Sequence, residues 1–184
     1  MKMIGQYIDQ IIKANNCTQV DVARGIGVSR QQLNYIILGK RELTLQQALK
    51  IESYFSLPEG QILKLQTEIA IFNYKQKIKQ QLFENLLKVQ ALWSYSNPSI
   101  ENISDEELIE KVFIYLDINQ ISKMFELYKR DYIRKVWREK LAIQGNFLFN
   151  LNVMIALYYF DIAQPEQYLK RLEREYIKNQ LNYA

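Results

Sequence analysis

A short run of hydrogen-bonding side chains follows Ser29 and shares one face of a predicted helix. Its members, Arg30, Gln31, Asn34 and Tyr35, recur at helical spacing. An arginine can donate two hydrogen bonds to guanine, a glutamine can pair with adenine, and a tyrosine ring can pack on a thymine methyl group or the sugar-phosphate edge. Such a face is suited to reading base edges in a DNA major groove, although it would also suit a solvated helix surface.

The segment 18–41 predicts two short helices that would hold this face. Its middle, Gly25-Ile26-Gly27, predicts a tight turn, because glycine reaches positive φ without steric cost. Ser29 would then begin the second helix as its N-cap, and Gln32, three residues on, completes a capping box. Gly39 ends that helix. Val20, Val22 and Ala23 supply the apolar side of the first helix, and Leu33, Ile36 and Ile37 are expected to be the buried side of the second.

This pattern resembles the helix-turn-helix of the lambdoid phage repressor and Cro family, also called the XRE type. The resemblance covers residues 4–70 and rests on Gln19 in second place on the first helix, the glycine turn, the Ser29 cap and Leu38-Gly39-Lys40. It implies a five-helix domain in which Gln19 contacts a phosphate and the second helix contacts bases. Basic residues after that helix suit phosphate contacts, which set affinity and register rather than sequence. The expected DNA-binding residues are Gln19, Ser29, Arg30, Gln31, Asn34, Tyr35, Lys40 and Arg41.

Within that family, the chain also resembles the HigA-type antitoxins. The residues that carry this second resemblance are Leu43-Thr44-Leu45, Ala48-Leu49 and Leu63-Lys64-Leu65-Gln66. It implies a repressor that controls its own toxin–antitoxin operon and has a toxin protein as its partner. Arg30 departs from the family, because it is charged where polar amides are frequent. The operator sequence therefore does not follow from the resemblance.

Composition bounds the function of the whole chain. It has 184 residues, a net charge of +4, one cysteine and no histidine, so it lacks the commonest general base and metal ligand. No nucleophile–base, phosphate-loop or metal-ligand motif is present, so we expect no enzyme activity, no cofactor and no metal. No window approaches the length of an apolar membrane span and no signal peptide is evident. We therefore expect a cytoplasmic protein that does not enter the membrane.

The positive charge is concentrated in the first half of the chain. Residues 1–96 hold 12 Lys/Arg and 7 Asp/Glu, whereas residues 97–184 hold 12 and 13. A DNA-binding surface would require its basic excess in that first half. A surplus of this size is also common in proteins that do not bind DNA.

We expect an all-α chain in three parts. These are a helix-turn-helix domain at 1–72, a connecting helix at 73–96 and a C-terminal helical bundle at 97–184 that dimerises or binds a partner. Residues 59–95 contain one glycine and no proline, which permits one long helix. The polar middle, Asn73 to Gln81, is typical of a helix that bridges two packed bodies. It could also mark a break near 73–77, and a coiled-coil dimer stem is a further alternative.

The C-terminal part reads as five short helices after a boundary at 94–99, where turn-forming residues surround Pro98. They are expected at about 104–116, 117–128, 130–143, 146–161 and 165–179. Residues 147–160 are apolar enough to be buried on all sides or to form a dimer seam. The segment 129–140 is rich in basic residues, and Arg130, Arg134 and Arg138 share one of its faces. That face is either the solvated side of an amphipathic helix or a contact surface for an acidic partner or nucleic acid.

These features favour a sequence-specific transcriptional repressor, an antitoxin in the narrower interpretation. It would be a homodimer that reads a palindromic operator in double-stranded DNA, since a single module has too small an interface for high specificity. The alternative keeps the DNA-binding head but makes residues 100–184 a sensor of a peptide or small ligand.

Overall fold

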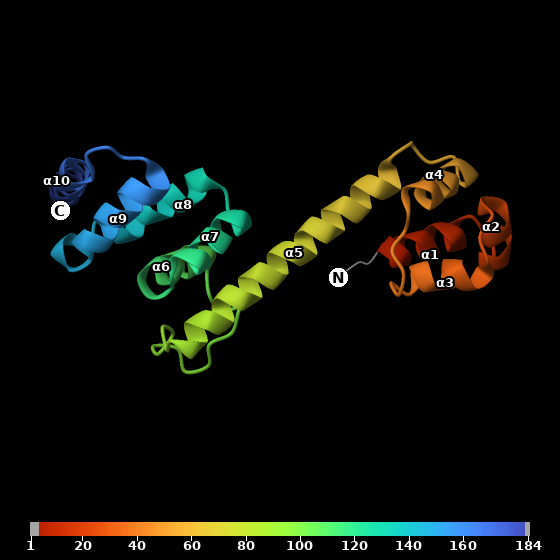
Figure 1. Cartoon of the computed structure of the whole chain (residues 1–184), viewed down its shortest axis with the longest axis horizontal. Helices are drawn as coiled ribbons and strands as arrows, with labels where there is room; N and C mark the ends of the chain where they lie inside the picture. Colours follow the sequence, from red (N-terminus) through yellow and green to blue (C-terminus); the bar gives the residue numbers. More distant parts are fainter. Residues whose placement is uncertain (1–3, 183–184) are drawn as a thin grey trace. The chain divides into compact units, whose positions relative to one another are not determined.

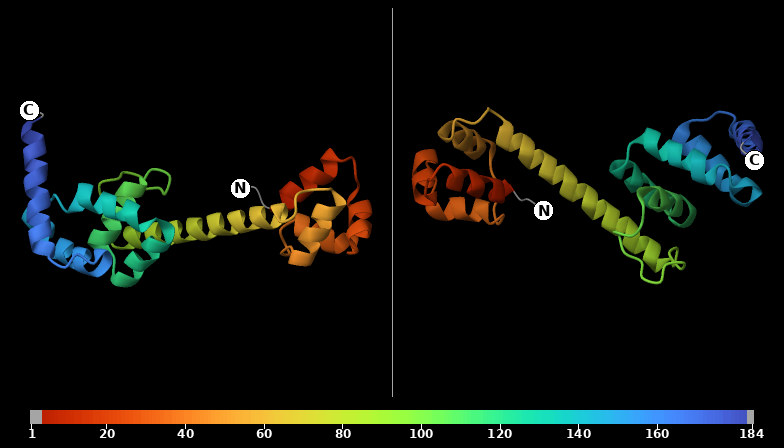
Figure 2. Two further views of the ribbon diagram at one scale, coloured as in Figure 1. Left: turned by 90° about the horizontal axis from the view of Figure 1, so that it is seen from above. Right: turned by 180° about the vertical axis from the view of Figure 1, so that it is seen from behind.

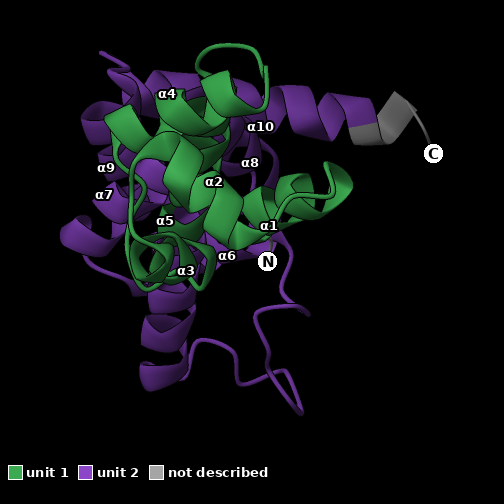
Figure 3. Cartoon of the chain, turned by 90° about the vertical axis from the view of Figure 1, so that its right-hand side faces the viewer, with its two compact units in different colours: residues 1–74 green, residues 75–184 purple. Residues whose placement is uncertain are grey.

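The computed structural model describes residues 4–182, with side chains to residue 179, and all regular elements in that range are helical (Figure 1). The predicted all-α fold class is therefore confirmed. The chain divides into two compact units, residues 1–74 and 75–184 (Figure 3). Helix α5, Gln61–Lys88, contributes to both units.

Unit 1 consists of four short helices and the first half of α5. Its helices are α1 (Ile4–Ala14), α2 (Gln19–Ile26), α3 (Arg30–Ile37) and α4 (Leu45–Tyr54). Helices α2, α3 and α4 each begin with a capping box, in which the cap side chain and the third helical residue exchange hydrogen bonds with backbone N–H groups. The buried core is Ile8, Ile12, Val22, Ala23, Ile26, Leu33, Ile36, Leu43, Ala48, Ile51 and Ile62.

Two residues fix how the helices of unit 1 meet. Gly5 on α1 lies against the end of α3, where an added Cβ would stand 2.1 Å from the Ile37 carbonyl oxygen, so only glycine permits this approach. Glu52 on α4 is 2% exposed. Its carboxylate accepts backbone hydrogen bonds from Gly60 at 2.8 Å and Ile62 at 2.6 Å, at the start of α5. The buried Glu52 carboxylate thus caps the start of α5, because it accepts from two backbone N–H groups that would otherwise be unpaired.

Helix α5 has 28 residues and is shorter than the permitted segment 59–95. It remains helical through residues 73–77 and ends at Lys88 because Gln90 adopts φ 54°. The N–H of Gln90 donates to Leu87 O, and that of Ala91 donates to Leu86 O, both at 3.0 Å. This Schellman arrangement usually employs glycine. A glutamine in its place left no sequence signal for the end of the helix.

Unit 2 consists of the second half of α5 and the helical segments that follow it. They are α6 (Asp105–Tyr115), α7 (Ile118–Leu127), α8 (Arg130–Val136) with a π-helical turn (Trp137–Leu141), a 3₁₀ turn (Gly145–Leu148), α9 (Phe149–Phe160) and α10 (Pro165–Asn182). The bend between the segment 145–160 and α10 is 113° (Figure 2). Buried residues from all the α-helices of the unit form one core, which includes Leu82, Leu86, Leu108, Ile109, Val112, Phe113, Met124, Ile133, Trp137 and Ile155.

The predicted helix 130–143 is α8 continued by a π-helical turn, Trp137–Leu141. In that turn the N–H of Ala142 donates to Trp137 O at 2.9 Å. Buried Asn152 on α9 supports it on both sides. Its Oδ1 accepts from the Trp137 indole at 2.8 Å, and its Nδ2 donates to Leu141 O at 2.9 Å. The wide turn is therefore held by a fully satisfied polar pair inside the core.

Of the two alternatives for residues 147–160, a segment buried on all sides or a dimer seam, the first is wrong. Phe147 in the 3₁₀ turn is 89% exposed, and Leu157 and Tyr158 are 49% and 63% exposed. One face of α9, including Asn152, Ile155, Ala156, Tyr159 and Phe160, enters the core.

Among the described residues, no single helix is long and apolar enough to cross a membrane. Only the bent pair 145–160 with 165–179 has the length and composition of a membrane span.

Candidate DNA-binding surface

Helices α2 and α3 are joined by a turn that depends on one glycine. Gly27 adopts φ 69°, and the N–H of Val28 donates to Ala23 O at 2.9 Å. Gly25 does not belong to the turn, which corrects the expectation that the helix stops there. It lies within α2, where an added Cβ would stand 2.2 Å from the Tyr54 ring of α4. One glycine therefore supplies the backbone angle and the other supplies room for α4.

Helix α3 presents its polar face as the sequence predicts. Ser29 Oγ accepts from the N–H of Gln32, and Gln32 Oε1 accepts from the N–H of Ser29, both at 3.1 Å. Leu33 and Ile36 are fully buried beneath the helix, while Ile37 is partly buried. Opposite them, the side chains of Arg30 and Gln31 are exposed, Tyr35 is 39% exposed and Asn34 is half-buried.

Two residues of this face contact each other. The Gln31 amide nitrogen donates to the Tyr35 hydroxyl at 2.9 Å, one helical turn away. Gln31 keeps its amide oxygen and a second N–H for a ligand, and Tyr35 keeps its own O–H as a donor. The pair restricts the Gln31 side chain before any ligand arrives. Sequence spacing places the two residues on one face, but only the side-chain geometry shows that they are linked.

The basic residues after α3 lie at its carboxyl end. Gly39 adopts φ 68°, and the backbone N–H groups of Lys40 and Arg41 both donate to Tyr35 O, at 2.8 and 3.2 Å. The two side chains are exposed. This hydrogen-bonded turn fixes the backbone position of both residues, and among the described residues neither side chain has a carboxylate oxygen within 4.0 Å.

The amino end of α2 carries the remaining predicted site residue and a fixed negative charge. Gln19 is the first residue of α2 and is half-buried. Beside it, Asp21 accepts from the Thr18 hydroxyl at 2.5 Å and from the Thr18 N–H at 3.3 Å. These two hydrogen bonds hold the pKa of Asp21 below its ordinary value. A phosphate near Gln19 would therefore meet free helical N–H groups and also this carboxylate.

Sequence reasoning missed Lys50 of α4. Its ammonium nitrogen lies 3.6 Å from the position that a Cβ on Gly27 would occupy, so it reaches the turn between α2 and α3. Lys50 is separated from the turn by more than twenty residues of sequence. No local pattern could have placed it there, because its position depends on the packing of α4 on α2.

The three arginines predicted to share a face in unit 2 have different environments. Arg130 donates from Nε and Nη2 to Tyr159 O at 3.1 and 2.8 Å and pairs with the Asp161 carboxylate. It thereby caps the carboxyl end of α9. Arg134 and Arg138 instead line a groove between α8 and α10. The structure thus brings two of the three together and gives the third a partner at the end of α9.

The described residues contain no cluster of three or more histidine, cysteine, aspartate or glutamate side chains arranged to hold a metal. Comparison with known proteins gives a match within unit 1. Residues 8–62 match the Helix-turn-helix family model. No curated protein and no solved structure matches the chain significantly. The matched range includes α2, its glycine turn and α3 in full. The chain therefore carries an amino-terminal helix-turn-helix domain of the XRE/Cro type, a DNA-binding family whose members are typically non-enzymatic transcriptional regulators.

Proposed function

We propose that this protein is a sequence-specific transcriptional repressor that binds a palindromic operator as a homodimer. The observation that carries the proposal is the exposed polar face of α3, held by the Ser29 capping box and the bond from Gln31 to Tyr35. Arg30 and Gln31, at the amino end of α3, would enter the major groove and contact base edges. Gln19, Lys40 and Arg41 would contact phosphates and fix the register.

A second copy is part of the proposal. One helix-turn-helix module contacts too few base pairs for high specificity, whereas two modules can read half-sites ~34 Å apart. Ile71 and Phe72 in the unit 1 part of α5 are 51% and 50% exposed. Neither belongs to the unit 1 core. Adjacent unpaired apolar side chains of this size support self-association through α5.

The narrower role that we propose is that of an antitoxin that represses its own operon. Unit 2 would then bind the toxin, while unit 1 binds the operator. The resemblance of residues 43–66 to HigA-type antitoxins supports this role.

The alternative is a regulator in which unit 2 senses a peptide or small ligand. A groove of ≈ 520 Å³ within unit 2 is the observation that favours it. A toxin that copurifies with the chain supports the antitoxin role, whereas a ligand that changes operator affinity supports the sensor.

The test is binding of the full chain to a duplex taken from immediately upstream of its gene, beside a scrambled duplex, across a range of salt concentrations. We expect a preference for the upstream duplex that persists at physiological salt. Equal and steeply salt-dependent binding to both would mean only attraction to the backbone and would overturn the proposal.

Substitutions then distinguish base-specific contacts with the duplex from general attraction by charge. Arg30→Ala and Gln31→Ala should each weaken binding to the upstream duplex by about 1–3 kcal/mol, with a smaller effect on the scrambled duplex. Arg174→Ala, an exposed arginine of unit 2, is the control and should leave both affinities unchanged.

A further inference from the structure

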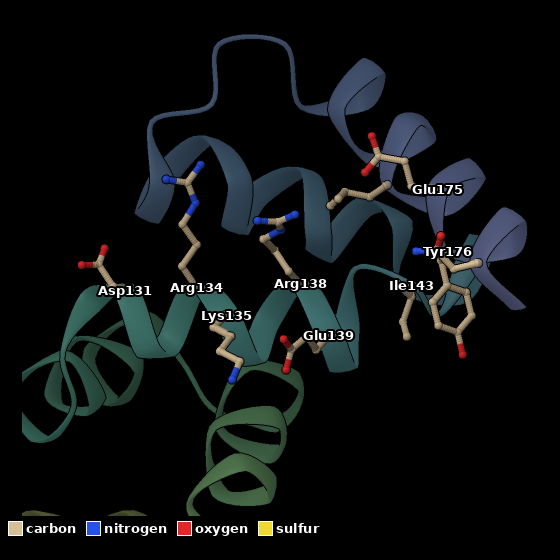
Figure 4. A pocket seen from close by; sticks show the side chains of 10 residues that line it. Asp131, Arg134, Lys135, Arg138, Glu139, Ile143, Glu175 and Tyr176 are labelled. Atoms are coloured by element: carbon tan, nitrogen blue, oxygen red, sulfur yellow. The ribbon is translucent and has the colours of Figure 1, made fainter. Parts of the chain in front are cut away.

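A groove within unit 2 has the features of a protein-binding site. It lies between the wall formed by α8 and its π turn and the wall formed by α10, and it has a volume of ≈ 520 Å³ (Figure 4). Arg134, Arg138 and Ile143 line the first wall, and Leu172, Glu175 and Tyr176 line the second. The groove is open to solvent, so a segment of another chain can enter it from the side.

One wall of the groove presents two cations without carboxylate partners. Arg134 and Arg138 are one helical turn apart and point to the same side, away from Lys135 and Glu139 (Figure 4). In the described part of the chain, neither has a carboxylate oxygen within 4.0 Å. The Arg134 guanidinium instead lies 5.8 Å from the centre of the Phe160 ring. Both side chains are exposed.

The lining of the groove also contains other charged side chains. Asp131, Lys135 and Glu139 lie on the same wall as the two arginines, and Glu175 lies on the opposite wall. Lys135 and Glu139 point away from the arginines (Figure 4), and a carboxylate oxygen of Glu175 lies 3.8 Å from Arg171 Nε. The wall formed by α8 and its π turn thus has three basic and two acidic side chains, an excess of one positive charge.

The lining also has an apolar part, formed by Ile143, Leu172 and Tyr176. Tyr176 is 41% exposed, whereas Leu172 is 7% exposed. Arginine and tyrosine contribute most of the binding energy at many protein interfaces, because each combines a large contact area with directional hydrogen bonds. Their presence beside buried leucine suits a partner that has both apolar and anionic side chains.

The wall that carries the two arginines is joined to the core of unit 2 by Trp137. Arg138 lies on the π turn, which the Trp137–Asn152 hydrogen bond holds from inside the core. The Trp137 ring stacks on Tyr168 of α10, with ring centroids 6.1 Å apart. Trp137 therefore belongs to one wall of the groove and contacts the helix that forms the other. Single π turns within helices occur frequently at functional sites.

We propose that this groove binds an acidic amphipathic helix of a partner protein. Carboxylates one turn apart on that helix would meet Arg134 and Arg138, and its apolar side chains would lie on Ile143, Leu172 and Tyr176. The two arginines have the same i, i+4 spacing as the carboxylates of such a helix. An open groove between two helices can also hold a third helix. The inference rests on the proposed function only in that unit 2 is taken to bind a partner.

The experiment uses the full chain and a fluorescein-labelled peptide of about 18 residues, long enough to form a helix when bound. Leucines form one stripe of the peptide, and glutamates at i, i+4 spacing form its edge. A second peptide carries lysine for each glutamate. Fluorescence anisotropy measures both affinities for the wild type and for the double variant Arg134→Glu with Arg138→Glu. The matched control is Arg174→Glu with Lys178→Glu, an exposed basic pair one turn apart on α10 and outside the groove.

We expect the wild type to bind the acidic peptide at least about tenfold more tightly than the basic peptide. The groove variant should lose at least about tenfold in affinity for the acidic peptide and should prefer the basic one, while the control pair should change by less than about twofold. The milder Arg138→Gln should give a smaller loss, and circular dichroism should show native helix content in each variant.

Three results would overturn the inference. The first is a wild type without preference for the acidic peptide, and the second is an equal loss in the groove and control variants, which would mean attraction by net charge alone. The third is a loss of peptide binding in Arg30→Ala, which should bind the peptide as the wild type does, because such a loss would place the peptide on unit 1. The groove variants should bind duplex DNA as tightly as the wild type does, so DNA binding tests the proposed function separately.

Discussion

At the scale of single residues, the exposed face of α3 depends on a contact between two of its own side chains. Gln31 donates to the Tyr35 hydroxyl at 2.9 Å, which holds its amide along the helix. A side chain already restricted in this way loses less conformational freedom when it binds. Tyr35 would therefore act partly through Gln31 and not only through its own contact with DNA.

Tyr35→Phe tests this arrangement. Loss of the hydroxyl should weaken binding to the operator duplex by about 0.5–1.5 kcal/mol, the net value of one hydrogen bond, and should leave thermal stability unchanged. Tyr176→Phe, in unit 2, is the matched control. If Tyr35→Phe binds as tightly as the wild type, the pair has no part in DNA recognition.

Glu52→Ala tests the buried carboxylate that caps α5. The variant leaves the N–H groups of Gly60 and Ile62 without their acceptor, which should cost unit 1 about 3 kcal/mol of stability. Both tryptophans, Trp93 and Trp137, lie in unit 2, so their fluorescence reports that unit while circular dichroism reports both. We expect an earlier urea transition by circular dichroism with unchanged tryptophan fluorescence.

Glu68→Ala, an exposed glutamate on α5, should change neither transition. An unchanged circular dichroism transition in Glu52→Ala would show that the carboxylate contributes little.

At the scale of elements, Asp105 joins three helices of unit 2. It accepts from Lys79 of α5 and from Tyr128 at the end of α7, both at 2.6 Å. Burial alone would raise the pKa of Asp105, but these two hydrogen bonds outweigh it and hold the pKa below its ordinary value. Burial, with the bond to Asp105, raises the pKa of Tyr128 far above its ordinary range, so the phenol remains a donor.

The sign of the pH dependence follows from the lowered pKa. A carboxyl group with a lower pKa in the folded state stabilises the protein above its unfolded pKa, and that stability is lost as pH falls through the folded pKa. Tryptophan fluorescence during urea unfolding should therefore show unit 2 losing stability from about pH 4 downwards. Asp105→Asn should be less stable at pH 7 and should lose less on acidification, whereas Glu101→Gln should follow the wild type.

At the scale of the whole molecule, the proposed dimer links an apolar surface to DNA recognition. Phe72 is half exposed and lies in α5, outside the unit 1 core. Phe72→Glu should shift the chain from dimer to monomer in sedimentation velocity. It should also lower affinity for a palindromic duplex by at least about tenfold while affinity for a half-site is unchanged. Lys75→Glu, an exposed change on the same helix, is the control. A wild type that is monomeric at every concentration would contradict this prediction.

Local sequence signals were sufficient for most helix beginnings. Ser29 accepts from the third helical residue, as its position before an apolar periodic segment predicts, and Thr18 and Thr44 do the same at the starts of α2 and α4. The exposed face of α3 also followed from the sequence, because helical spacing alone places Leu33 and Ile36 opposite Arg30 and Gln31. These features depend on residues within one or two turns of each other.

Helix ends and polar contacts in the core required the tertiary structure. Gln90 ends α5 in a conformation that glycine usually adopts, and its neighbours Ala91 and Leu92 are buried there. Apolar composition suggested that residues 147–160 could be buried on all sides, whereas the polar Asn152 is buried and the apolar Phe147 is exposed. Which side of α9 faces the core depends on the helices around it.

The sequence by itself determined the helix-turn-helix, because its caps, glycine turn and apolar spacing are short-range features that each residue type specifies. Only the tertiary structure decided that Lys50 reaches the turn, that Arg130 caps α9, and that Arg134 and Arg138 face a groove. Those positions result from packing between helices that are distant in the chain. Three arginines with the same spacing therefore have two different environments.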